Sequence, residues 1–556
     1  MRLAWPAWKN LQVGAQNLRY DLFAGITVSL VAVPQSLAYA QLAGVPAYYG
    51  LYAAFLPTIV GAVFGSSAQL STGPVAMTSL LTAASVAPLA PRGTDAFYAS
   101  VILLALLSGI FQVAFGLLRA GVLLNFLSFP VLMGFINAAA LIIGLSQLPT
   151  LLGIPSRQSE HFLIDTWQVL WHIDSTHAIS LAFGACAIIL LLLFRRFAPK
   201  LPGVLITVAV LTWISGSIGY AAMGGRVVGS VPQGLPSFAI PKVEWNMVIA
   251  LTPAAFVVAV ISFMEAMSSA KVIAIRTRQP WDENRELIGQ GLAKVVAAFV
   301  QSMPVSGSFS RSALNLASDA KTRLASIVSA CAVLLTLLFF TSLLYDLPKP
   351  VLAAIIMMAV AGLLNFQALR TAWRTRRDDG IAAVATFVAT LAFAPNIQIG
   401  IVIGIMLSLG LLLYRLMRPR VAILGLHEDG VLRDARRFGL PALHPQLGAI
   451  RFDGSLHFIN ASFFEDALLK LERESPNLRY VLIACGGIND LDASGVDVLA
   501  KLVERFRNNH IELAFCGIKK QVQDVMDRGG LSEHIGRQNI FATDHLALDE
   551  LRARLG

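Results

Sequence analysis

The 556-residue chain is 56% hydrophobic and 14% charged, with a mean hydropathy of +0.67. These values exclude an ordinary soluble domain and indicate a polytopic membrane protein. The net charge of +10 divides into +13 for residues 1–420 and −3 for residues 421–556. We therefore assign the basic excess to a part of the chain that meets a lipid bilayer, and we expect no nucleic-acid partner.

Fourteen apolar segments follow one another along residues 1–420. A helix needs about 20 residues to cross a bilayer. The segments lie near 22–42, 48–65, 74–88, 96–118, 121–148, 178–196, 202–220, 248–271, 284–302, 308–320, 324–345, 350–366, 379–394 and 397–416. Because each half has an odd number of segments, seven, the second half has the opposite orientation in the membrane to the first. We expect a polytopic α-helical membrane domain over 1–420 with 7+7 inverted repeats, about 20–220 and 248–416.

Basic residues recur on alternate connections between these segments, as the positive-inside rule requires. Both termini are then cytoplasmic, and we expect a multi-pass protein of a bacterial inner membrane. The first residues contain Trp5, Pro6 and Trp8 where the apolar core of a signal peptide would lie, so we expect no cleaved signal.

Two polar runs, Ser71–Met77 and Ser306–Ser312, interrupt the apolar sequence at corresponding places in the two halves. Each opens a segment that is too short to span the membrane at about 1.5 Å per residue. Two half-helices of opposite orientation would direct free N–H groups and positive dipole ends at the space between them, which suits an anion. The alternative is a pair of kinked helices that pack through small residues.

Side chains within these runs can complete an anion site. Pro74 suits a first-turn position because it has no N–H group, and Ser308 and Ser310 can cap a helix or donate to a ligand. Arg311 lies just inside the second half-helix, where its charge opposes the local dipole. An unpaired charge at that depth is costly, so we expect an anion to compensate it.

One acidic residue, Glu265, lies deep in an apolar segment, four residues before Ser269 on the same helix face. It either neutralises Arg311 or binds the proton or sodium ion that travels with the substrate. We favour the coupling role, with Ser269 as a second oxygen, because burial makes the charge of a carboxylate adjustable. Lys294, in the next segment, either joins this network or extends its amine away from the apolar layer.

Gln35 and Tyr39 lie four residues apart on one face of the first segment, just past Pro34. Proline frees backbone groups, so this face combines an amide, an aromatic ring and unpaired backbone atoms. We interpret it as a further wall of the anion site. The alternative is a polar contact between helices.

After Arg420 the pattern changes to short apolar strands alternating with amphipathic helices, which is typical of a small α/β domain. We expect a linker over 421–440 and this domain over 441–556. Its expected elements are strands near 448–458, 480–485 and 512–517 and helices near 461–474, 493–508 and 520–528.

The motifs of the first part resemble the sulfate permease (SulP) family of anion transporters. They are Pro34–Ala40, Leu42–Pro46, Tyr49–Tyr52, Ser71–Ala76 and Gly307–Asn315. The resemblance covers nearly the whole chain and implies a core of the first four helices of each half, which moves against a gate in an elevator-like way. It also implies a homodimer and places the coupling acid at Glu265.

By this resemblance the anion lies between the two half-helices. The implied substrate-binding residues are Gln35, Tyr39, Gly73, Pro74, Val75, Ala76, Ser308, Phe309, Ser310 and Arg311.

The tail resembles STAS domains through Asp490–Leu499. In soluble members the serine that matches Ser494 is phosphorylated, so Ser494 is a possible regulatory residue, although a helix-start role comes first. Asp492 is expected to cap the same helix. A cytoplasmic protein partner of this domain is a further possibility that the resemblance raises.

The function we expect is secondary active transport of sulfate by proton-coupled symport. The open alternatives are bicarbonate or a dicarboxylate with proton or sodium coupling, an anion exchanger, a passive channel, and a membrane sensor that uses the tail. We expect no enzyme, cofactor or metal site. The four cysteines have no ligand spacing and are interpreted as small core residues.

Overall fold

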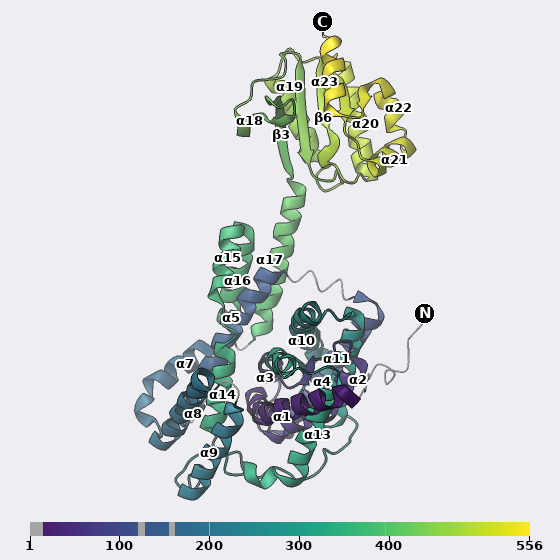
Figure 1. Cartoon of the computed structure of the whole chain (residues 1–556). Coiled ribbons are helices and arrows are strands. Elements are labelled where there is room, and N and C mark those ends of the chain that lie inside the picture. Colours follow the sequence, from purple (N-terminus) through teal and green to yellow (C-terminus); the bar gives the residue numbers. More distant parts are fainter. Residues whose placement is uncertain (1–14, 121–127, 155–161, 199–200, 395, 556) are drawn as a thin grey trace. The chain divides into compact units, whose positions relative to one another are not determined.

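The computed structural model describes residues 15–120, 128–154, 162–198, 201–394 and 396–555. It divides into two compact units, Met1–Ser408 and Leu409–Gly556, with the boundary inside the last apolar helix. Figure 1 follows the chain through both units.

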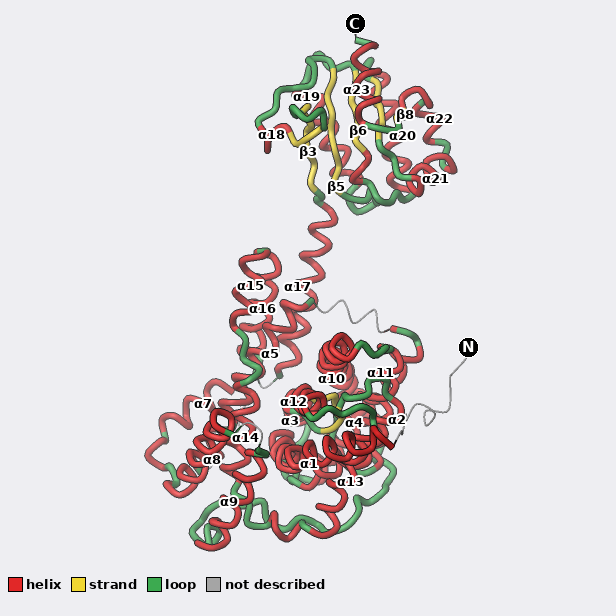
Figure 2. The backbone as a smooth tube through the Cα atoms, in the orientation of Figure 1, coloured by secondary structure: helices red, strands yellow, loops and turns green. Residues whose placement is uncertain are grey.

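The first unit is helical apart from two three-residue strands (Figure 2). Seven helices of the described residues are long and apolar enough to cross a membrane, and four shorter apolar helices accompany them. The main elements are α1 (Ala15–Ala43), α2 (Tyr48–Phe64), β1 (Ser71–Gly73), α3 (Ala76–Val86), α4 (Asp95–Leu117), α5 (Phe129–Ser146), α8 (Ala178–Phe197), α9 (Gly203–Ile218), α10 (Trp245–Thr277), α11 (Glu283–Phe299), β2 (Ser306–Ser308), α12 (Phe309–Ala317), α13 (Leu324–Phe339), α14 (Lys349–Ala361), α16 (Arg377–Ala392) and α17 (Ile397–Met417).

These helices pack as two sets. The first four helical elements of each half, α1–α4 and α10–α13, contact one another, and α5, α8, α9, α14 and α16 form the second set. Glycines allow α4 and α11 to approach closely: a Cβ on Gly109 of α4 would lie 2.8 Å from the carbonyl oxygen of Gly291 on α11. The two sets meet where α1 contacts α9 and α14, and where α3 contacts α5 and α14.

Several boundaries differ from the sequence-based expectation. Residues 121–127 of the fifth expected segment lie outside the described residues. The twelfth segment stops at Ala361 and is followed by a separate amphipathic helix, α15 (Phe366–Thr375), which has no buried residue. Another short helix, α7 (Phe162–Trp171), lies in a stretch for which no segment was expected.

The second unit contains a six-stranded sheet of order β4-β3-β5-β6-β7-β8. Strands β5 to β8 run parallel, while β3 runs antiparallel to β5 and β4 antiparallel to β3. Apolar clusters cover both faces, as in a layered α/β domain. The elements are β3 (Arg420–Leu426), β4 (Leu432–Asp434), α18 (Ala435–Phe438), β5 (Leu447–Asp453), α19 (Ala461–Glu474), β6 (Tyr480–Ala484), α20 (Ala493–Asn508), β7 (Glu512–Cys516), α21 (Lys520–Arg528), α22 (Leu531–Ile535), β8 (Ile540–Phe541) and α23 (Asp544–Ala553).

The expected linker over 421–440 is wrong, because this segment forms β3, β4 and α18 of the sheet domain. Alternate residues of β3 face opposite sides of the sheet, so Ala422 and Leu424 are buried in one apolar cluster while Val421 and Ile423 pack on the other. The sheet domain therefore begins directly after α17.

Candidate anion site

Two short strands hold the polar runs together in the first unit. β1 pairs antiparallel with β2 in a register that joins Ser71 to Ser308, Thr72 to Gly307 and Gly73 to Ser306. Because β1 leads into α3 and β2 leads into α12, the antiparallel pairing sends the two short helices away in opposite directions. Their N-termini consequently start from one place.

Hydrogen bonds from surrounding helices fix this strand pair. Thr58 of α2 donates to the carbonyl of Thr72 at 2.8 Å, and the amide of Gln290 on α11 donates to the Thr72 hydroxyl, also at 2.8 Å. Ser312 of α12 accepts from the N–H of Ser71 at 2.9 Å. These groups of the strand pair are thus bonded within the protein, since a membrane interior would offer them no water.

The two helix starts differ in how they are capped. Ser308 is the N-cap of α12, and its hydroxyl accepts from the N–H of Arg311 at 3.4 Å. Val75 is the N-cap of α3 and provides no side-chain cap. Pro74 precedes that cap, so the expected first-turn position for this proline is wrong. The first N–H groups of α3 remain without a side-chain cap.

Arg311 links the two short helices. It is 2% exposed, its Nε donates to the Ser71 hydroxyl at 3.4 Å, and its Nη1 donates to the carbonyl of Pro74 at 2.9 Å. Its Nη2 is buried without a hydrogen-bond partner among the described residues. A Cβ added to Gly73 would lie 2.8 Å from this Nη2, so the guanidinium lies against the glycine backbone.

Side chains of α1 and α10 surround the guanidinium, and both helices pack against α3 and α12. Tyr39 is 5% exposed and lies within electrostatic reach of Arg311 and Glu265. Four polar atoms of α1 and α10 are buried without a partner among the described residues, namely Gln35 Oε1, Ser36 Oγ, Glu265 Oε2 and Ser269 Oγ. A buried polar atom without a partner costs free energy, so these atoms and Arg311 Nη2 are well suited to a polar ligand.

Glu265 also lies within electrostatic reach of Lys294, a fully buried residue of α11. No ion pair within 4.0 Å joins Glu265 to either cation in the described part of the chain. The Lys294 amine instead donates to the Ser262 hydroxyl, one turn before Glu265. The carboxylate is therefore close to two positive charges without being locked in a salt bridge.

The remaining predicted residues differ in exposure. Val75 and Ala76 are buried at 4% and 7%, whereas Phe309 is 53% exposed and Ser310 is exposed beside it.

The polar residues Thr58 and Gln290, which bond the strand pair, were not predicted from the sequence. Their only sequence signal is a polar residue on an apolar helix.

Two other carboxylates are buried in this unit and serve the backbone. Asp21 accepts from the N–H groups of Lys321 and Thr322, and Glu286 accepts from those of Ser66 and Ser67. Asp21 thus holds the connection between α12 and α13, and Glu286 holds the connection between α2 and β1.

A cavity of about 1350 Å³ opens at the other end of α3. Its lining includes Gln41 and three basic residues, Arg92, Arg226 and Lys349, together with Asp165. The N–H of Lys349 donates to the carbonyl of Arg226 at 2.9 Å. None of the three basic side chains has a carboxylate within 4.0 Å among the described residues, so the cavity presents positive charge.

In the sheet domain, Asp492 is the N-cap of α20, where its carboxylate accepts from the N–H of Gly495 and the N–H of Phe458, each at 2.8 Å. Partial burial opposes ionisation, but these backbone donors hold the pKa of Asp492 below its usual range. Ser494 is exposed in the first turn of the same helix. Its hydroxyl is thus accessible at a helix N-terminus, where added negative charge is favourable.

The cysteines divide between the units. Cys485 and Cys516 are buried in the sheet domain, and burial raises the pKa of Cys485 to about 12. Cys186 and Cys331 are exposed on α8 and α13, so the expectation that they are core residues is wrong. The described residues contain no cluster of three or more possible metal ligands.

A helical membrane domain with two opposed short helices around a buried guanidinium, joined to a small α/β domain, defines an anion transporter. The model of the sulfate permease family matches residues 18–386, and that of the STAS domain matches residues 442–547. The chain belongs to the sulfate permease family and is a transporter, not an enzyme.

Curated relatives cover nearly the whole chain. The chloroplastic sulfate transporter 4.1 of Arabidopsis thaliana is 31% identical over 97% of this chain and 81% of its own length. A sodium-independent sulfate anion transporter of Bos taurus is 31% identical over 92% of this chain and 85% of its own.

The solved structure of the murine Solute Carrier 26 family member A9 anion transporter, in its inward-facing state, matches with a TM-score of 0.91. It covers 99% of this chain and 94% of its own, at 23% identity. That likeness concerns the fold.

Proposed function

We propose that this protein transports sulfate into a bacterial cell by proton-coupled symport. The observation that carries the proposal is the set of buried, unpartnered polar atoms at Arg311, Gln35, Glu265 and Ser269. Sulfate is the substrate named for both relatives described above, which cover 97% and 92% of this chain, and we extend that substrate to this chain.

The anion binds between the N-termini of α3 and α12. Arg311 supplies a full positive charge, and the uncapped N–H groups of α3 add the partial charge of a helix dipole. Gln35 and Tyr39 of α1 and Phe309 and Ser310 of α12 complete the walls. Gly73, Pro74, Val75, Ala76 and Ser308 shape the backbone around the ligand.

Glu265 carries the coupling proton. Its carboxylate is near two cations but unpaired, so its charge can change as an anion arrives or leaves. Sodium is the less favoured ion because Glu265 and Ser269 together provide only a thin oxygen shell. The sodium-independent relative favours the same choice.

Alternating access follows an elevator-type motion in this proposal. The set formed by α1–α4 and α10–α13 carries the strand pair and the site as one body, which moves against the second set. The 7+7 inverted repeat accounts for the opposed short helices. The protein is a homodimer in a bacterial inner membrane, with both termini cytoplasmic. The sheet domain offers a surface to a cytoplasmic protein, and Ser494 is its regulatory residue.

Transport into proteoliposomes tests this function. Purified protein is reconstituted, and uptake of labelled sulfate, bicarbonate, chloride and succinate is measured under imposed pH and sodium gradients. Sulfate uptake that rises with an inward proton gradient is expected. Preference for bicarbonate or a dicarboxylate, or a dependence on sodium at fixed pH, would favour an alternative substrate or ion.

A further inference from the structure

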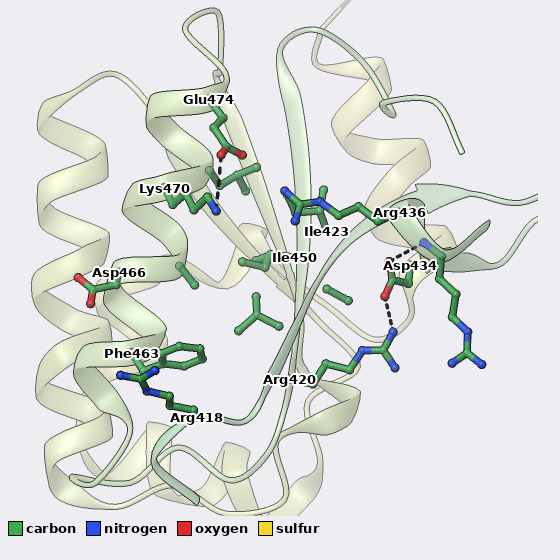
Figure 3. Close-up of a pocket in the computed structure, with 15 residues that line it drawn as sticks. Arg418, Arg420, Ile423, Asp434, Arg436, Ile450, Phe463, Asp466, Lys470 and Glu474 are labelled. Atoms are coloured by element: carbon green, nitrogen blue, oxygen red, sulfur yellow. Dashed lines mark hydrogen bonds and ion pairs between the residues drawn. The ribbon is translucent and has the colours of Figure 1, made fainter. Parts of the chain in front are cut away.

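A second cavity, of about 750 Å³, lies within the sheet domain (Figure 3). It is bounded by β3 and β5 on the sheet, by α19 on one side and by α18 on the other. Five basic and three acidic side chains line it, so its net charge is positive. The charged members are Arg418, Arg420, Arg436, Arg437, Lys470, Asp434, Asp466 and Glu474.

The floor of this cavity is apolar. Val421 and Ile423 of β3 face the same side of the sheet as Ile450 of β5, and both remain half-exposed beside α19. Phe463 and Leu471 of α19 form the adjoining wall. The cavity is therefore the part of the sheet face that α19 leaves uncovered, and it combines apolar surface with a basic rim.

The basic rim is only partly neutralised. Arg420 forms an ion pair with Asp434, and Nζ of Lys470 lies 3.8 Å from Oε1 of Glu474. Arg418, Arg436 and Arg437 have no carboxylate within 4.0 Å among the described residues. In Figure 3 the Arg436 side chain extends across β3 toward Ile423, over the apolar floor. Arg418 donates one N–H to the Tyr414 hydroxyl at 3.3 Å, and its other N–H groups, with the guanidinium groups of Arg436 and Arg437, remain available to an anionic ligand.

The chain places this cavity beside a bilayer. Arg418 is the first residue after α17, which is an apolar spanning helix, and Arg420 begins β3. Three residues of chain reach at most about 10 Å, so this side of the rim lies close to the level at which α17 leaves the apolar layer. The amide of Asn460, at the start of α19, donates to the carbonyl of Leu416 at 3.0 Å and ties the domain to the helix end.

We propose that this cavity binds the phosphate headgroup of an anionic phospholipid from the leaflet that α17 leaves. Guanidinium groups bind phosphate with directed hydrogen bonds. The apolar floor suits the glycerol and upper acyl carbons that accompany a lipid phosphate. The position next to a spanning helix favours a lipid over a soluble phosphate compound, because basic clusters there face the charged membrane surface.

The test uses the full-length protein in nanodiscs of phosphatidylcholine, with and without phosphatidylglycerol. Hydrogen exchange is followed over residues 432–440 and 461–474. The double variant Arg436→Gln/Arg437→Gln is compared with Arg505→Gln/Arg528→Gln, which removes the same charge from α20 and α21. Inorganic phosphate and ATP are added in separate arms to discs without phosphatidylglycerol.

We expect phosphatidylglycerol to slow exchange in the wild type and in the control double variant. The cavity variant should need a roughly tenfold higher fraction of phosphatidylglycerol for the same protection. Equal protection in both double variants, or none in the wild type, would overturn the proposal. Protection by phosphate or ATP alone would assign the cavity to a soluble ligand instead. If exchange in β6 and β7 shows that the double variant is unfolded, Arg418→Gln makes the same comparison.

Discussion

Nη1 of Arg311 donates to the carbonyl oxygen of Pro74 at 2.9 Å, across 237 positions of sequence. This bond joins the start of α12 to the residues that precede α3. It orients the guanidinium so that Nη2 remains without a partner among the described residues. Substitution of Gly73 changes the contacts of this guanidinium, and substitution of Glu265 changes the charge near it.

Gly73→Ala should weaken sulfate binding by about tenfold without unfolding the protein. The new Cβ would lie 2.8 Å from Nη2, so the guanidinium must move. Overpacking of this kind costs roughly 1–3 kcal/mol. Gly410→Ala is the matched control, because nothing lies within 4 Å of its added Cβ. Equal affinity of the two variants, measured by equilibrium binding, would show that Arg311 is not held against Gly73.

Glu265→Gln should uncouple transport from the pH gradient. The amide mimics the protonated acid, so anion exchange should continue while gradient-driven accumulation is lost. Uptake by proteoliposomes, with and without an inward pH gradient, measures this. Glu244→Gln changes an exposed acid and should respond as the wild type does. A Glu265→Gln protein that still accumulates sulfate would assign the proton to another group.

Lys349→Gln should slow uptake at low ionic strength. Lys349 is one of three basic residues in the cavity at the far end of α3, and such a cavity concentrates anions before they bind. We expect the rate of uptake to decrease about threefold at low ionic strength. The decrease should disappear at about 1 M salt, where the Debye screening length is only about 3 Å. Lys242→Gln, at an exposed position outside this cavity, is the control. A decrease that is independent of salt would indicate a structural role.

Asp492→Ala should destabilise α20 by about 1–2 kcal/mol at neutral pH, because it removes an N-cap. Hydrogen exchange of residues 493–508 in the full chain measures the effect, and Asp497→Ala, which breaks an exposed ion pair, should change it by less than about 0.5 kcal/mol. The pKa of Asp492 is below its usual range in the folded domain. Its stabilisation is therefore complete above the unfolded pKa of about 4 and is lost as the pH falls through the lower folded value. A constant difference between the wild type and Asp492→Ala across that interval would contradict the assignment.

Much of the site could be predicted because glycine, serine and proline are conspicuous in an apolar sequence. Those residues marked both short helices and led to Arg311. The pairing of β1 with β2 could not be predicted, since three-residue strands rich in serine and glycine lack a strand pattern and their partners lie more than 230 residues apart.

The start of the sheet domain was missed for another reason. Residues 418–420 mark the end of α17, but residues 421–426 of β3 form one short apolar run, and a single short run before the regular strand–helix alternation is interpreted as a linker. The six-stranded register shows why the second unit requires this segment, because β3 pairs with β5. A truncation that removes only residues 441–556 would therefore leave β3 and β4 without β5 and the rest of the sheet.

The most direct test of the account measures binding of radiolabelled sulfate to the purified wild type, to Arg311→Ala and to Arg276→Ala. Arg276 is an exposed basic residue in the last turn of α10 and serves as the control. Loss of a charged hydrogen-bond donor should weaken binding roughly 10- to 100-fold in Arg311→Ala alone. Wild-type affinity in a folded Arg311→Ala protein would contradict the central claim that the anion is held between α3 and α12.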